Sequence, residues 1–325
     1  MTARRVFIRL PNWLGDLLMS RLLLHALRAA LPGAHLAAMG TAASKLLDRE
    51  RVWDAWGAWL PDSRVRLEAW HARYDTALVL PPSFSSAWMV PRGVANRIGF
   101  AADGRSPLLT RSVPRPARGE LHLSAEYLRL GESLGVLPVS LPALEPLTSE
   151  REEALGRLRR IEVGERPYVV LGPGAAYGPA KRWSAECFVE LGRQFTARGL
   201  AVLACGAAED REIVMPIAAA IGPLAHSLAG HTSLGEQLAL CAGARVTVSN
   251  DSGLAHLAAA AGGATVVIFG STSSAWTAPL GPRVRIVQRP PVCAPCFQRT
   301  CRIGYRCLAA IEVSDVGRAC AEIAA

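Results

Sequence analysis

Short apolar runs alternate with amphipathic segments along the whole chain, and this alternation limits the possible folds more than any other feature. The apolar runs have the length of buried strands, and the segments between them have helical periodicity. The strand candidates are residues 6–10, 36–39, 76–80, 97–100, 168–171, 201–205, 245–248 and 265–269. The helix candidates are residues 16–31, 184–198, 209–220, 234–242 and 252–261. Alternating strands and helices predict parallel sheets of the α/β class.

A proline-rich stretch, residues 137–149, divides this alternation into two arrays. Prolines stand at positions 138, 142 and 146, as is typical of a stiff interdomain linker. We therefore predict an α/β chain with two Rossmann-like, doubly wound parallel-sheet domains, 1–149 and 150–325, that face a cleft. Ligands of such sheets bind beyond the carboxyl ends of the strands, so the loops that follow strands are the first candidates for a site.

The composition indicates a folded chain with an anionic partner. Half of the 325 residues are hydrophobic and 19% are charged, which excludes a disordered chain. The net charge is +9, and 22 basic against 15 acidic residues place +7 of it in residues 1–160. Lys45 and Lys181 are the only lysines, and every other basic residue is an arginine. The first half is therefore expected to bind nucleic acid, an anionic lipid or an acidic sugar.

One apolar stretch has to be distinguished from a membrane span. Between Ser252 and Pro282 the only ionisable side chain is His256. Gly262 and Gly263 interrupt this stretch, which predicts a helix, a turn and a parallel strand instead of about 20 continuous apolar residues. The residues before position 11 also lack an apolar core of signal-peptide length. We expect a cytoplasmic protein without a membrane span, which leaves binding to a membrane surface open.

The loop after the first strand candidate, residues 11–16, carries a carboxylate. Gly15 permits a tight turn, and Asp16 falls at or near the start of the following helix. Aspartate is a favoured N-cap residue, and capping alone would explain its position. The alternative is a general base at the mouth of the cleft.

The loop after residue 171 is rich in glycine and carries the basic pair Lys181 and Arg182. Its glycines allow the backbone to approach a phosphate, and the basic pair adds positive charge. The spacing G-x-G-x-x-x-G is not the dinucleotide fingerprint, and no Gly-Lys-Ser/Thr of a P-loop occurs in the chain. A glycine-rich turn with a solvated basic pair is the alternative interpretation.

The sequence Asn250-Asp251-Ser252-Gly253 ends another strand candidate and opens a helix. The N–H groups and dipole of such a helix start suit a phosphate. A helix capped by Ser252 is the alternative, with His256 as a hydrogen-bonded core histidine. An aspartate beside a phosphate is electrostatically unfavourable unless it orients donors or bonds a backbone amide, which counts against a simple cap at Asp251.

Two further groups are candidates for binding. Glu209 and Asp210 follow a strand candidate and either accept hydrogen bonds from a ribose diol or stand in the first turn of a helix. Four cysteines have the spacing C-x2-C-x4-C-x5-C, which lacks a second C-x2-C knuckle and favours free thiols over a zinc or iron–sulfur site. They are Cys293, Cys296, Cys301 and Cys307.

Six arginines share a segment with a single acidic residue, Asp103, and a solvated surface is the expectation for such a run. They are Arg92, Arg97, Arg105, Arg111, Arg115 and Arg118. No helix-turn-helix, RNP or zinc-finger pattern accompanies them, which disfavours nucleic acid as the anionic partner.

Three of these segments together resemble the bacterial lipopolysaccharide heptosyltransferases, and most closely their heptosyltransferase II group. The segments read P-N-W-L-G-D-L-L-M-S, G-P-G-A-A-Y-G-P-A-K-R-W and S-N-D-S-G-L-A-H-L-A-A-A, and they occur in the same order over nearly the whole chain. The resemblance implies a GT-B fold and an inverting transfer of L-glycero-D-manno-heptose from ADP-heptose to the first heptose of heptosyl-Kdo2-lipid A. It assigns the acceptor to domain 1–149 and ADP-heptose to domain 150–325, whose last helix often packs back on the first domain.

The resemblance also implies roles for single residues. Asp16 matches the base, and Lys181 matches the lysine that meets the donor diphosphate. Further donor contacts are implied at Gly174, Asp251, Ser252, Gly253 and His256, and either Glu209 or Asp210 would bind the ribose. Acceptor contacts are expected at Asn12, Trp13, Ser83 and Arg97, although Pro82 departs from an asparagine in the family pattern.

No Asp-x-Asp occurs in the chain, so the carboxylate pair typical of a catalytic metal is missing, and we expect neither a metal nor a cofactor. The expected partners are ADP-heptose, heptosyl-Kdo2-lipid A and the cytoplasmic face of the inner membrane, without nucleic acid. Heptosyltransferase I or III would differ only in the acceptor. A nicotinamide dehydrogenase would need a true G-x-G-x-x-G, and a non-catalytic nucleotide or lipid binder would not need a base.

Overall fold

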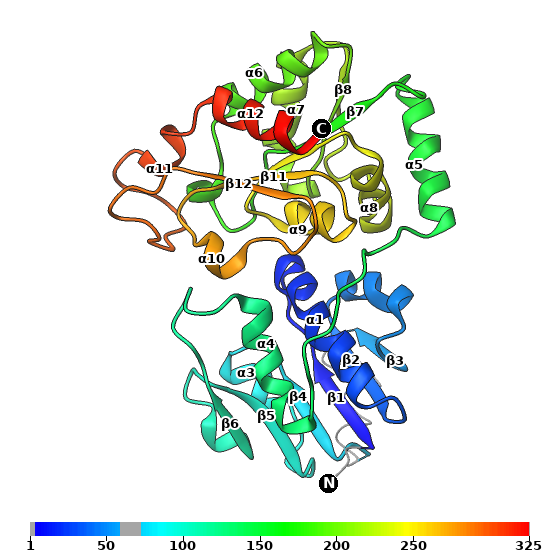
Figure 1. The fold of residues 1–325 in the computed structure, drawn as a ribbon, viewed down its shortest axis with the longest axis vertical. Helices are drawn as coiled ribbons and strands as arrows, with labels where there is room; N and C mark the ends of the chain where they lie inside the picture. Colours follow the sequence, from blue (N-terminus) through cyan, green and yellow to red (C-terminus); the bar gives the residue numbers. More distant parts are fainter. Residues whose placement is uncertain (1–3, 59–72, 325) are drawn as a thin grey trace. The chain divides into compact units, whose positions relative to one another are not determined.

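The computed structural model describes residues 4–58 and 73–324, and the chain forms two compact units, Met1–Pro142 and Ala143–Ala325 (Figure 1). The division falls within the predicted linker, which contains neither helix nor strand until α5 begins at Thr148. Each unit contains one six-stranded parallel sheet.

The first unit has the strand order β3-β2-β1-β4-β5-β6. Its strands are β1 (Arg5–Arg9), β2 (His35–Gly40), β3 (Ala55–Ala58), β4 (Thr76–Val79), β5 (Asn96–Ala101) and β6 (Arg111–Pro114). Its described α-helices are α1 (Leu14–Ala30), α3 (Phe84–Trp88) and α4 (Leu123–Gly131), and its described 3₁₀ turns are η1 (Ala42–Glu50), η2 (Ser106–Leu108) and η3 (Glu132–Leu134). The chain leaves the centre of the sheet in opposite directions from β1 and β4, so the topological switch point lies between these two strands.

The second unit has the same order about its own centre, β12-β11-β10-β7-β8-β9. Its strands are β7 (Tyr168–Gly172), β8 (Ala201–Ala204), β9 (Ala225–Ser227), β10 (Thr247–Asn250), β11 (Thr265–Phe269) and β12 (Val284–Gln288). Its α-helices are α5 (Thr148–Arg160), α6 (Ala185–Thr196), α7 (Arg211–Ile221), α8 (Leu234–Gly243), α9 (Gly253–Ala260), α10 (Ser274–Thr277), α11 (Arg306–Ala309) and α12 (Val313–Ala324). Its 3₁₀ turns are η4 (Pro179–Lys181) and η5 (Ala208–Asp210). The switch point lies between β7 and β10.

Apolar runs that are buried on both faces form the interior strands. Every residue of β4, β7, β8, β10 and β11 is buried, as parallel strands covered by helices on both sides require. The prediction for residues 252–282 is confirmed, because α9, a turn at Gly262 with φ +78° and β11 follow one another there. In the described part of the chain, no helix is long and apolar enough to cross a membrane. The last helix, α12, packs on β11, β12 and α6 of its own unit.

The sequence prediction missed β3, β6, β9 and β12, and these are the outermost strands of the two sheets. Their side chains are only partly buried, and β6 has three exposed residues out of four. An edge strand is paired on one side only and needs less apolar surface. It therefore lacks the continuous apolar run that reveals an interior strand.

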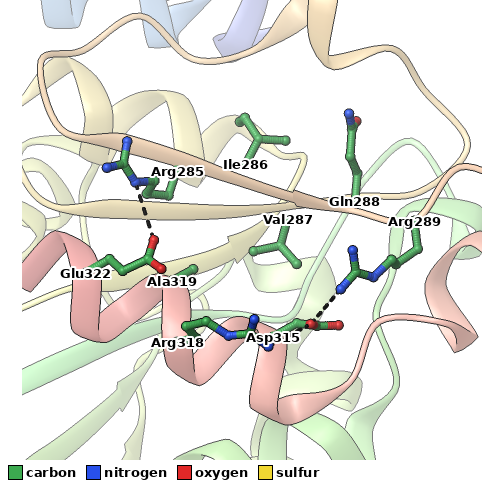
Figure 2. A pocket seen from close by; sticks show the side chains of 9 residues that line it. All are labelled: Arg285, Ile286, Val287, Gln288, Arg289, Asp315, Arg318, Ala319 and Glu322. Carbon is green, nitrogen blue, oxygen red and sulfur yellow. Dashed lines mark hydrogen bonds and ion pairs between the residues drawn. The ribbon is translucent and has the colours of Figure 1, made fainter.

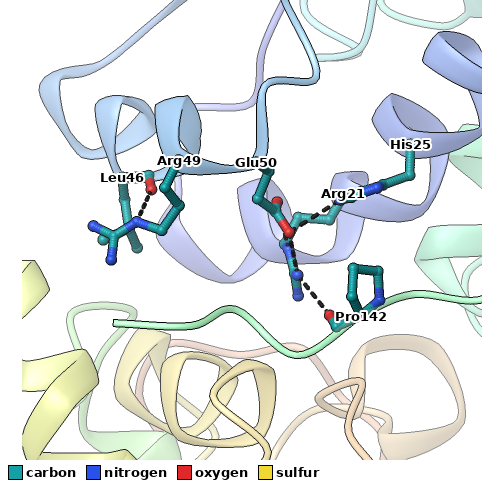
Figure 3. A network of polar contacts seen from close by, with 6 residues as sticks. All are labelled: Arg21, His25, Leu46, Arg49, Glu50 and Pro142. Carbon is teal, nitrogen blue, oxygen red and sulfur yellow. Dashed lines mark hydrogen bonds and ion pairs between the residues drawn. The ribbon is translucent and has the colours of Figure 1, made fainter. Parts of the chain in front are cut away.

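A buried polar network holds the end of the first unit against α1 (Figure 3). The guanidinium of Arg21, which is 1% exposed, donates to both carboxylate oxygens of Glu50 and, at 2.8 Å, to the carbonyl of Pro142. The His25 ring contacts the same carboxylate at 3.0 Å. Burial raises the pKa of Glu50, but hydrogen bonds and charge from Arg21 and His25 outweigh burial and lower it overall. The network fixes Pro142, within the linker, to the helix that carries Asp16.

Replacing Glu50 by glutamine is expected to lower the free energy of unfolding at pH 7 by about 3 kcal/mol, because Arg21 would lose its buried carboxylate. The folded-state pKa of Glu50 is lowered, so its stabilising effect is complete above the unfolded-state value of about 4.3 and fades as the pH falls through the folded-state pKa. Urea unfolding should therefore give the wild type a higher free energy of unfolding than the variant at pH 7, and this difference should become smaller below about pH 4. Glu322→Gln, which removes an exposed pair at 3.9 Å, should change little, and an equal loss in both variants would refute the prediction.

Candidate active site

The loop after β7, residues 173–183 and hereafter the Lys181 loop, is fixed at both ends by a buried asparagine. Asn250, at the end of β10, has no exposed surface. Its side chain donates to the Pro173 carbonyl at 2.7 Å and accepts from the Trp183 N–H at 3.0 Å. The Trp183 indole is itself anchored by a 3.0 Å bond to the Ile311 carbonyl. The Lys181 loop therefore lies at the switch point of the second sheet with defined end positions.

Lys181 forms an ion pair with Asp251, and this explains the aspartate in a phosphate-type loop. The Lys181 Nζ lies 2.6 Å from Asp251 Oδ2, and the two side chains are only 14% and 3% exposed. Thr272, after β11, donates its hydroxyl to the same carboxylate oxygen at 2.6 Å. The Tyr177 ring centroid lies 4.9 Å from the Lys181 Nζ. Asp251 thus orients the ammonium of Lys181. This is the role in which an aspartate is compatible with a phosphate-type loop, because its charge is then paired.

The start of α9 is not capped by Ser252. Ser252 occupies the N-cap position, but its hydroxyl makes no capping bond and instead pairs with the Ser249 hydroxyl at 2.9 Å. The first-turn N–H groups and the positive end of this eight-residue helix, beginning at the half-buried Gly253, therefore suit an anion better than a capped helix would. His256 lies one turn into α9 and is 5% exposed, which agrees with the interpretation as a core histidine.

Of the two acidic residues after β8, Asp210 is the one that lies against the Lys181 loop. A Cβ atom built on Gly174 would overlap the Asp210 carboxylate, so the glycine allows this close approach. Asp210 Oδ2 also accepts from the Ala207 N–H at 3.0 Å, while Glu209 is exposed. The geometry therefore favours Asp210 over Glu209 as the carboxylate of this site.

Replacing Gly174 by alanine is expected to raise about tenfold the KM for the nucleotide donor that the family resemblance implies, because the added methyl group would displace the Asp210 carboxylate. Thermal unfolding should change little, since the displaced group is only half buried. Gly164→Ala is a control for backbone strain alone. Gly164 has a φ of +59°, and a methyl group added there would meet nothing within 4 Å. A Gly174→Ala enzyme with unchanged donor KM would contradict the assignment of Asp210.

Asp16 is the third residue of α1 and not its N-cap. Trp13 occupies the cap position without a capping side chain, so the capping interpretation of Asp16 is wrong. The neighbouring Asn12 accepts a 2.6 Å bond from Arg9, whose pKa is lowered by burial to about 10. Burial, and then the charge of Asp16, raise the pKa of Tyr127 on α4. The half-buried Asp16 carboxylate thus lies at the carboxyl end of β1, close to α4.

The loop after β4 lies at the same end of the sheet as Asn12 and Trp13, because β1 and β4 are parallel neighbours. Ser83 caps α3 by accepting from the Ser86 N–H. Three aromatic residues here are strongly exposed, namely Trp13 in the loop after β1 at 56% and Phe84 and Trp88 of α3 at 44% and 62%. The Phe84 and Trp88 rings are stacked, with centroids 6.0 Å apart. We call Trp13, Phe84 and Trp88 the aromatic surface of the first unit.

The arginine segment is not uniformly solvated, which corrects the sequence expectation. Arg105 has no exposed surface, and its guanidinium donates to four backbone carbonyls, including those of Pro81 and Ser83. Burial lowers its pKa to about 10. Arg97 stands at the amino end of β5, the edge opposite to Asn12, Trp13 and Ser83, and donates to three backbone carbonyls. The structure therefore gives Arg105 and Arg97 structural tasks, and it does not bring Arg97 together with the other expected acceptor residues.

Three of the four clustered cysteines, Cys293, Cys296 and Cys301, lie in an irregular segment between β12 and α11, whereas Cys307 lies in α11, and all four are free thiols. Cys301 Sγ accepts from the Ile303 and Tyr305 N–H groups, and burial raises the pKa of the Cys307 thiol. Among residues 4–58 and 73–324, no three histidine, cysteine, aspartate or glutamate side chains are arranged to hold a metal. Of the remaining cysteines, Cys205, Cys241 and Cys320 are core residues, and Cys187 is half buried.

A separate cavity of about 210 Å³ lies between β12 and α12 (Figure 2). Its charged side chains are already engaged with one another, because Arg289 pairs with Asp315 at 2.7 Å and Arg285 lies 3.9 Å from Glu322. None of the sequence-predicted site residues lines it. The cavity is therefore no candidate for the donor or acceptor site.

Sequence reasoning missed Thr272 and Tyr177 as site residues. Thr272 stands in the loop after β11, where the strand-end rule would have found it if polar residues of every such loop had been considered. Tyr177 lies inside the predicted glycine-rich loop, but no pattern in the sequence indicates that its ring contacts the Lys181 ammonium. The contact between Lys181 and Asp251 joins residues that are distant in sequence and is likewise visible only in the structure.

Comparison with known proteins identifies the family. The family profile described as glycosyltransferase family 9 (heptosyltransferase) matches residues 66–306. Lipopolysaccharide heptosyltransferase 2 of Escherichia coli K12 is 32% identical over 300 residues, 86% of each chain. Lipooligosaccharide heptosyltransferase 2 of Haemophilus influenzae is 32% identical over 301 residues, again 86% of each chain. The structure of E. coli ADP-heptose heptosyltransferase II superposes with a TM-score of 0.79 and 28% identity, covering 99% of this chain and 100% of that one.

These matches agree with two Rossmann-like units in one chain, which is the GT-B fold. The matched region includes the Lys181 loop, Asp210 and the start of α9. The chain is a glycosyltransferase and belongs to glycosyltransferase family 9, the heptosyltransferase family.

Proposed function

We propose that this glycosyltransferase moves L-glycero-D-manno-heptose from ADP-heptose to the first heptose of the lipopolysaccharide inner core, with inversion at the anomeric carbon. The observation that carries the proposal is the Lys181–Asp251 pair beside the uncapped start of α9, which forms an anion site at the switch point. The names of relatives that match 86% of this chain, lipopolysaccharide and lipooligosaccharide heptosyltransferase 2, support the choice of sugar and acceptor.

The proposed reaction needs a base for the acceptor and positive charge for the leaving group. Asp16 removes the proton from the acceptor hydroxyl, whose oxygen attacks the anomeric carbon of the heptose. The bond from that carbon to the β-phosphate oxygen breaks, and ADP leaves with the electron pair. Lys181 and the first N–H groups of α9 stabilise the charge that grows on the diphosphate. Asp210 accepts hydrogen bonds from the ribose of the adenosine.

We also propose that the reaction uses protein cations in place of a catalytic metal. The chain has no Asp-x-Asp pair, and the carboxylate nearest the anion site, Asp251, is already engaged by Lys181 and Thr272. A metal would have to displace these partners to use Asp251 as a ligand. Transfer should therefore be unchanged by excess EDTA, and loss of transfer that Mg²⁺ restores would overturn this part of the proposal.

The acceptor is tested with purified enzyme, ADP-heptose and three acceptors, namely Kdo2-lipid A, heptosyl-Kdo2-lipid A and diheptosyl-Kdo2-lipid A, with product mass as the readout. Addition of one heptose to heptosyl-Kdo2-lipid A alone is expected. Addition to Kdo2-lipid A would assign heptosyltransferase I activity, and addition only to the diheptosyl acceptor would assign heptosyltransferase III activity. Binding of ADP without any transfer would favour a non-catalytic nucleotide binder.

For the lipid-linked acceptor, we propose that the first unit binds the cytoplasmic face of the inner membrane through its aromatic surface. Exposed tryptophan and phenylalanine side chains are typical of membrane-interface contacts. Arg92, whose guanidinium lies 6.0 Å from the Trp88 ring, adds a cation that attracts anionic headgroups. The aromatic surface and Asp16 lie at the same end of the first sheet. Membrane binding through this surface would therefore place the base near the lipid-linked sugar.

Replacing Phe84 and Trp88 together by serine is expected to lower the affinity for vesicles of phosphatidylethanolamine and phosphatidylglycerol about tenfold. The reason is that the variant has lost two apolar side chains that would move from water into the membrane interface. Cosedimentation measures the bound fraction. Met215→Ser, which removes an equally exposed apolar side chain on α7, is the matched control and should bind as the wild type does. Equal vesicle binding by the double variant and the wild type would refute the membrane surface.

A further inference from the structure

The irregular segment between β12 and α11, residues 289–305 and hereafter the Cys-rich segment, packs directly on the Lys181 loop. The Ala180 N–H donates to the Arg299 carbonyl at 3.0 Å, and the Tyr177 hydroxyl donates to the Phe297 carbonyl. The Phe297 N–H in turn donates to the Ser271 carbonyl at 2.8 Å. These backbone bonds hold the Cys-rich segment in register with the loop that carries Lys181.

Gly178 shows how closely the two segments approach. It has a φ of +146°, and a Cβ atom built on it would lie 2.6 Å from the Arg299 carbonyl oxygen. Only glycine allows this approach, because any side chain would push the two backbones apart. The position of Arg299 beside the Lys181 loop is therefore fixed by the backbone and not by its own side chain.

Two cations lie against the same aromatic ring at this place. The Tyr177 ring centroid is 4.9 Å from the Lys181 Nζ and 5.4 Å from the Arg299 Cζ, which puts the two charges within about 10 Å of each other. The Arg299 side chain is exposed. Because the exposed Arg299 guanidinium shares this ring with Lys181, it is accessible to a ligand that Lys181 also contacts.

The charges around the site show why a second cation matters. Lys181 is neutralised by Asp251 at 2.6 Å, and the Arg182 fork is occupied by the Ala175 carbonyl. Among the described residues, no carboxylate lies within ion-pair distance of Arg299. A diphosphate brings more than one negative charge, and a planar guanidinium binds two phosphate oxygens at once. Arg299 thus has charge and donors available to a ligand that reaches the Lys181 loop.

We propose that Arg299 is a second diphosphate-binding residue of the donor site, supplied to the Lys181 loop by the Cys-rich segment. The proposal rests on the proposed function, because it takes a nucleoside diphosphate as the donor's leaving group. Tyr177 positions both cations through its ring and fixes the Cys-rich segment through its hydroxyl. The fold thereby gives the Cys-rich segment a task that needs no metal.

The proposal is tested by calorimetric titration of ADP and of adenosine into the wild type, Arg299→Gln and Arg299→Lys. Arg299→Gln is expected to weaken ADP binding about tenfold or more and to leave adenosine binding unchanged, since only the diphosphate loses a charged partner. Arg299→Lys should recover most of the ADP affinity. Arg302→Gln makes the same charge change at an exposed position of the same segment and should bind ADP as the wild type does.

Substitution of Arg299 leaves its carbonyl in place, so the backbone bond to Ala180 persists and folding is expected to be retained. Unchanged ADP affinity in Arg299→Gln, or an equal loss for ADP and adenosine, would overturn the proposal. If the wild type binds ADP in an Arg299-dependent manner but transfers no heptose, the proposed function fails while the role of Arg299 stands. If heptose transfer proceeds and Arg299→Gln binds ADP normally, only the role of Arg299 fails.

Discussion

The Asp16→Asn enzyme is expected to lose about 10²- to 10⁴-fold in kcat, because asparagine keeps the shape of the side chain but cannot accept the proton of the acceptor hydroxyl. KM for ADP-heptose should change little, since the proposed role of Asp16 concerns the acceptor alone. Initial rates with heptosyl-Kdo2-lipid A as acceptor measure both quantities. The size of the effect follows from the loss of general base catalysis, which the bound nucleotide cannot replace.

Glu132→Gln is the matched control for Asp16→Asn, because it removes an exposed carboxylate of the same unit. It is expected to transfer heptose at the wild-type rate. An Asp16→Asn enzyme with near wild-type kcat would show that Asp16 is not the base. Asp16 is the third residue of α1 and Trp13 occupies the N-cap position, so Asp16→Asn leaves the N-cap residue unchanged.

Replacing Lys181 by alanine is expected to lower kcat about 10²- to 10³-fold, because the departing diphosphate loses the cation nearest to the start of α9. ADP affinity should fall as well, in contrast to the Asp16 variant. The variant leaves Asp251, which is 3% exposed, without its cation, so thermal unfolding is expected at a lower temperature. Steady-state rates and a thermal scan of the same preparation separate the two effects.

A double-mutant cycle tests whether Asp251 acts through Lys181. Asp251→Asn alone should reduce kcat, since Lys181 loses the partner that orients it. In the Lys181→Ala background, Asp251→Asn should cost no further activity and should restore part of the lost stability, because a neutral amide replaces the unpaired buried carboxylate. Additive losses in kcat would mean that Asp251 acts on the substrate independently of the lysine.

The interior strands of both sheets could be predicted from the sequence, because a strand that is buried on both faces has a continuous run of apolar residues. Residues 265–269 were predicted as a strand and form β11 with the same bounds. The edges could not be predicted in this way, as β6 shows with its sequence Arg-Ser-Val-Pro and one half-buried residue. Pairing with a neighbouring strand, and not hydrophobic pattern, defines such an edge.

The loops of the candidate site could also be predicted, because the strand-end rule depends only on the order of strands and loops. The contacts inside the site could not. An aspartate beside a phosphate is electrostatically unfavourable, and only the structure shows that Asp251 pairs with Lys181. Likewise, Arg105 reads as a surface charge in the sequence, whereas its fully buried guanidinium holds the carbonyls of the loop after β4.

The choice between enzyme classes followed from patterns that the sequence does contain. The third glycine of the loop after residue 171 comes one residue later than in the G-x-G-x-x-G of a nicotinamide-binding turn. Family membership agrees with a glycosyltransferase. The excess positive charge of the first half is less specific than it seemed, since Arg97 and Arg105 bond backbone carbonyls. The aromatic surface offers a more local feature by which a lipid-linked acceptor would be bound.

The proposed reaction is an inverting heptosyl transfer in which Asp16 is the base and ADP the leaving group. The most direct measurement is the product formed by the wild type from ADP-heptose and heptosyl-Kdo2-lipid A, with its mass, the configuration of the new bond and the ADP released. The expected result is one added heptose, an inverted anomeric configuration and one ADP for each heptose transferred. A retained configuration, or ADP release without added mass, would contradict it.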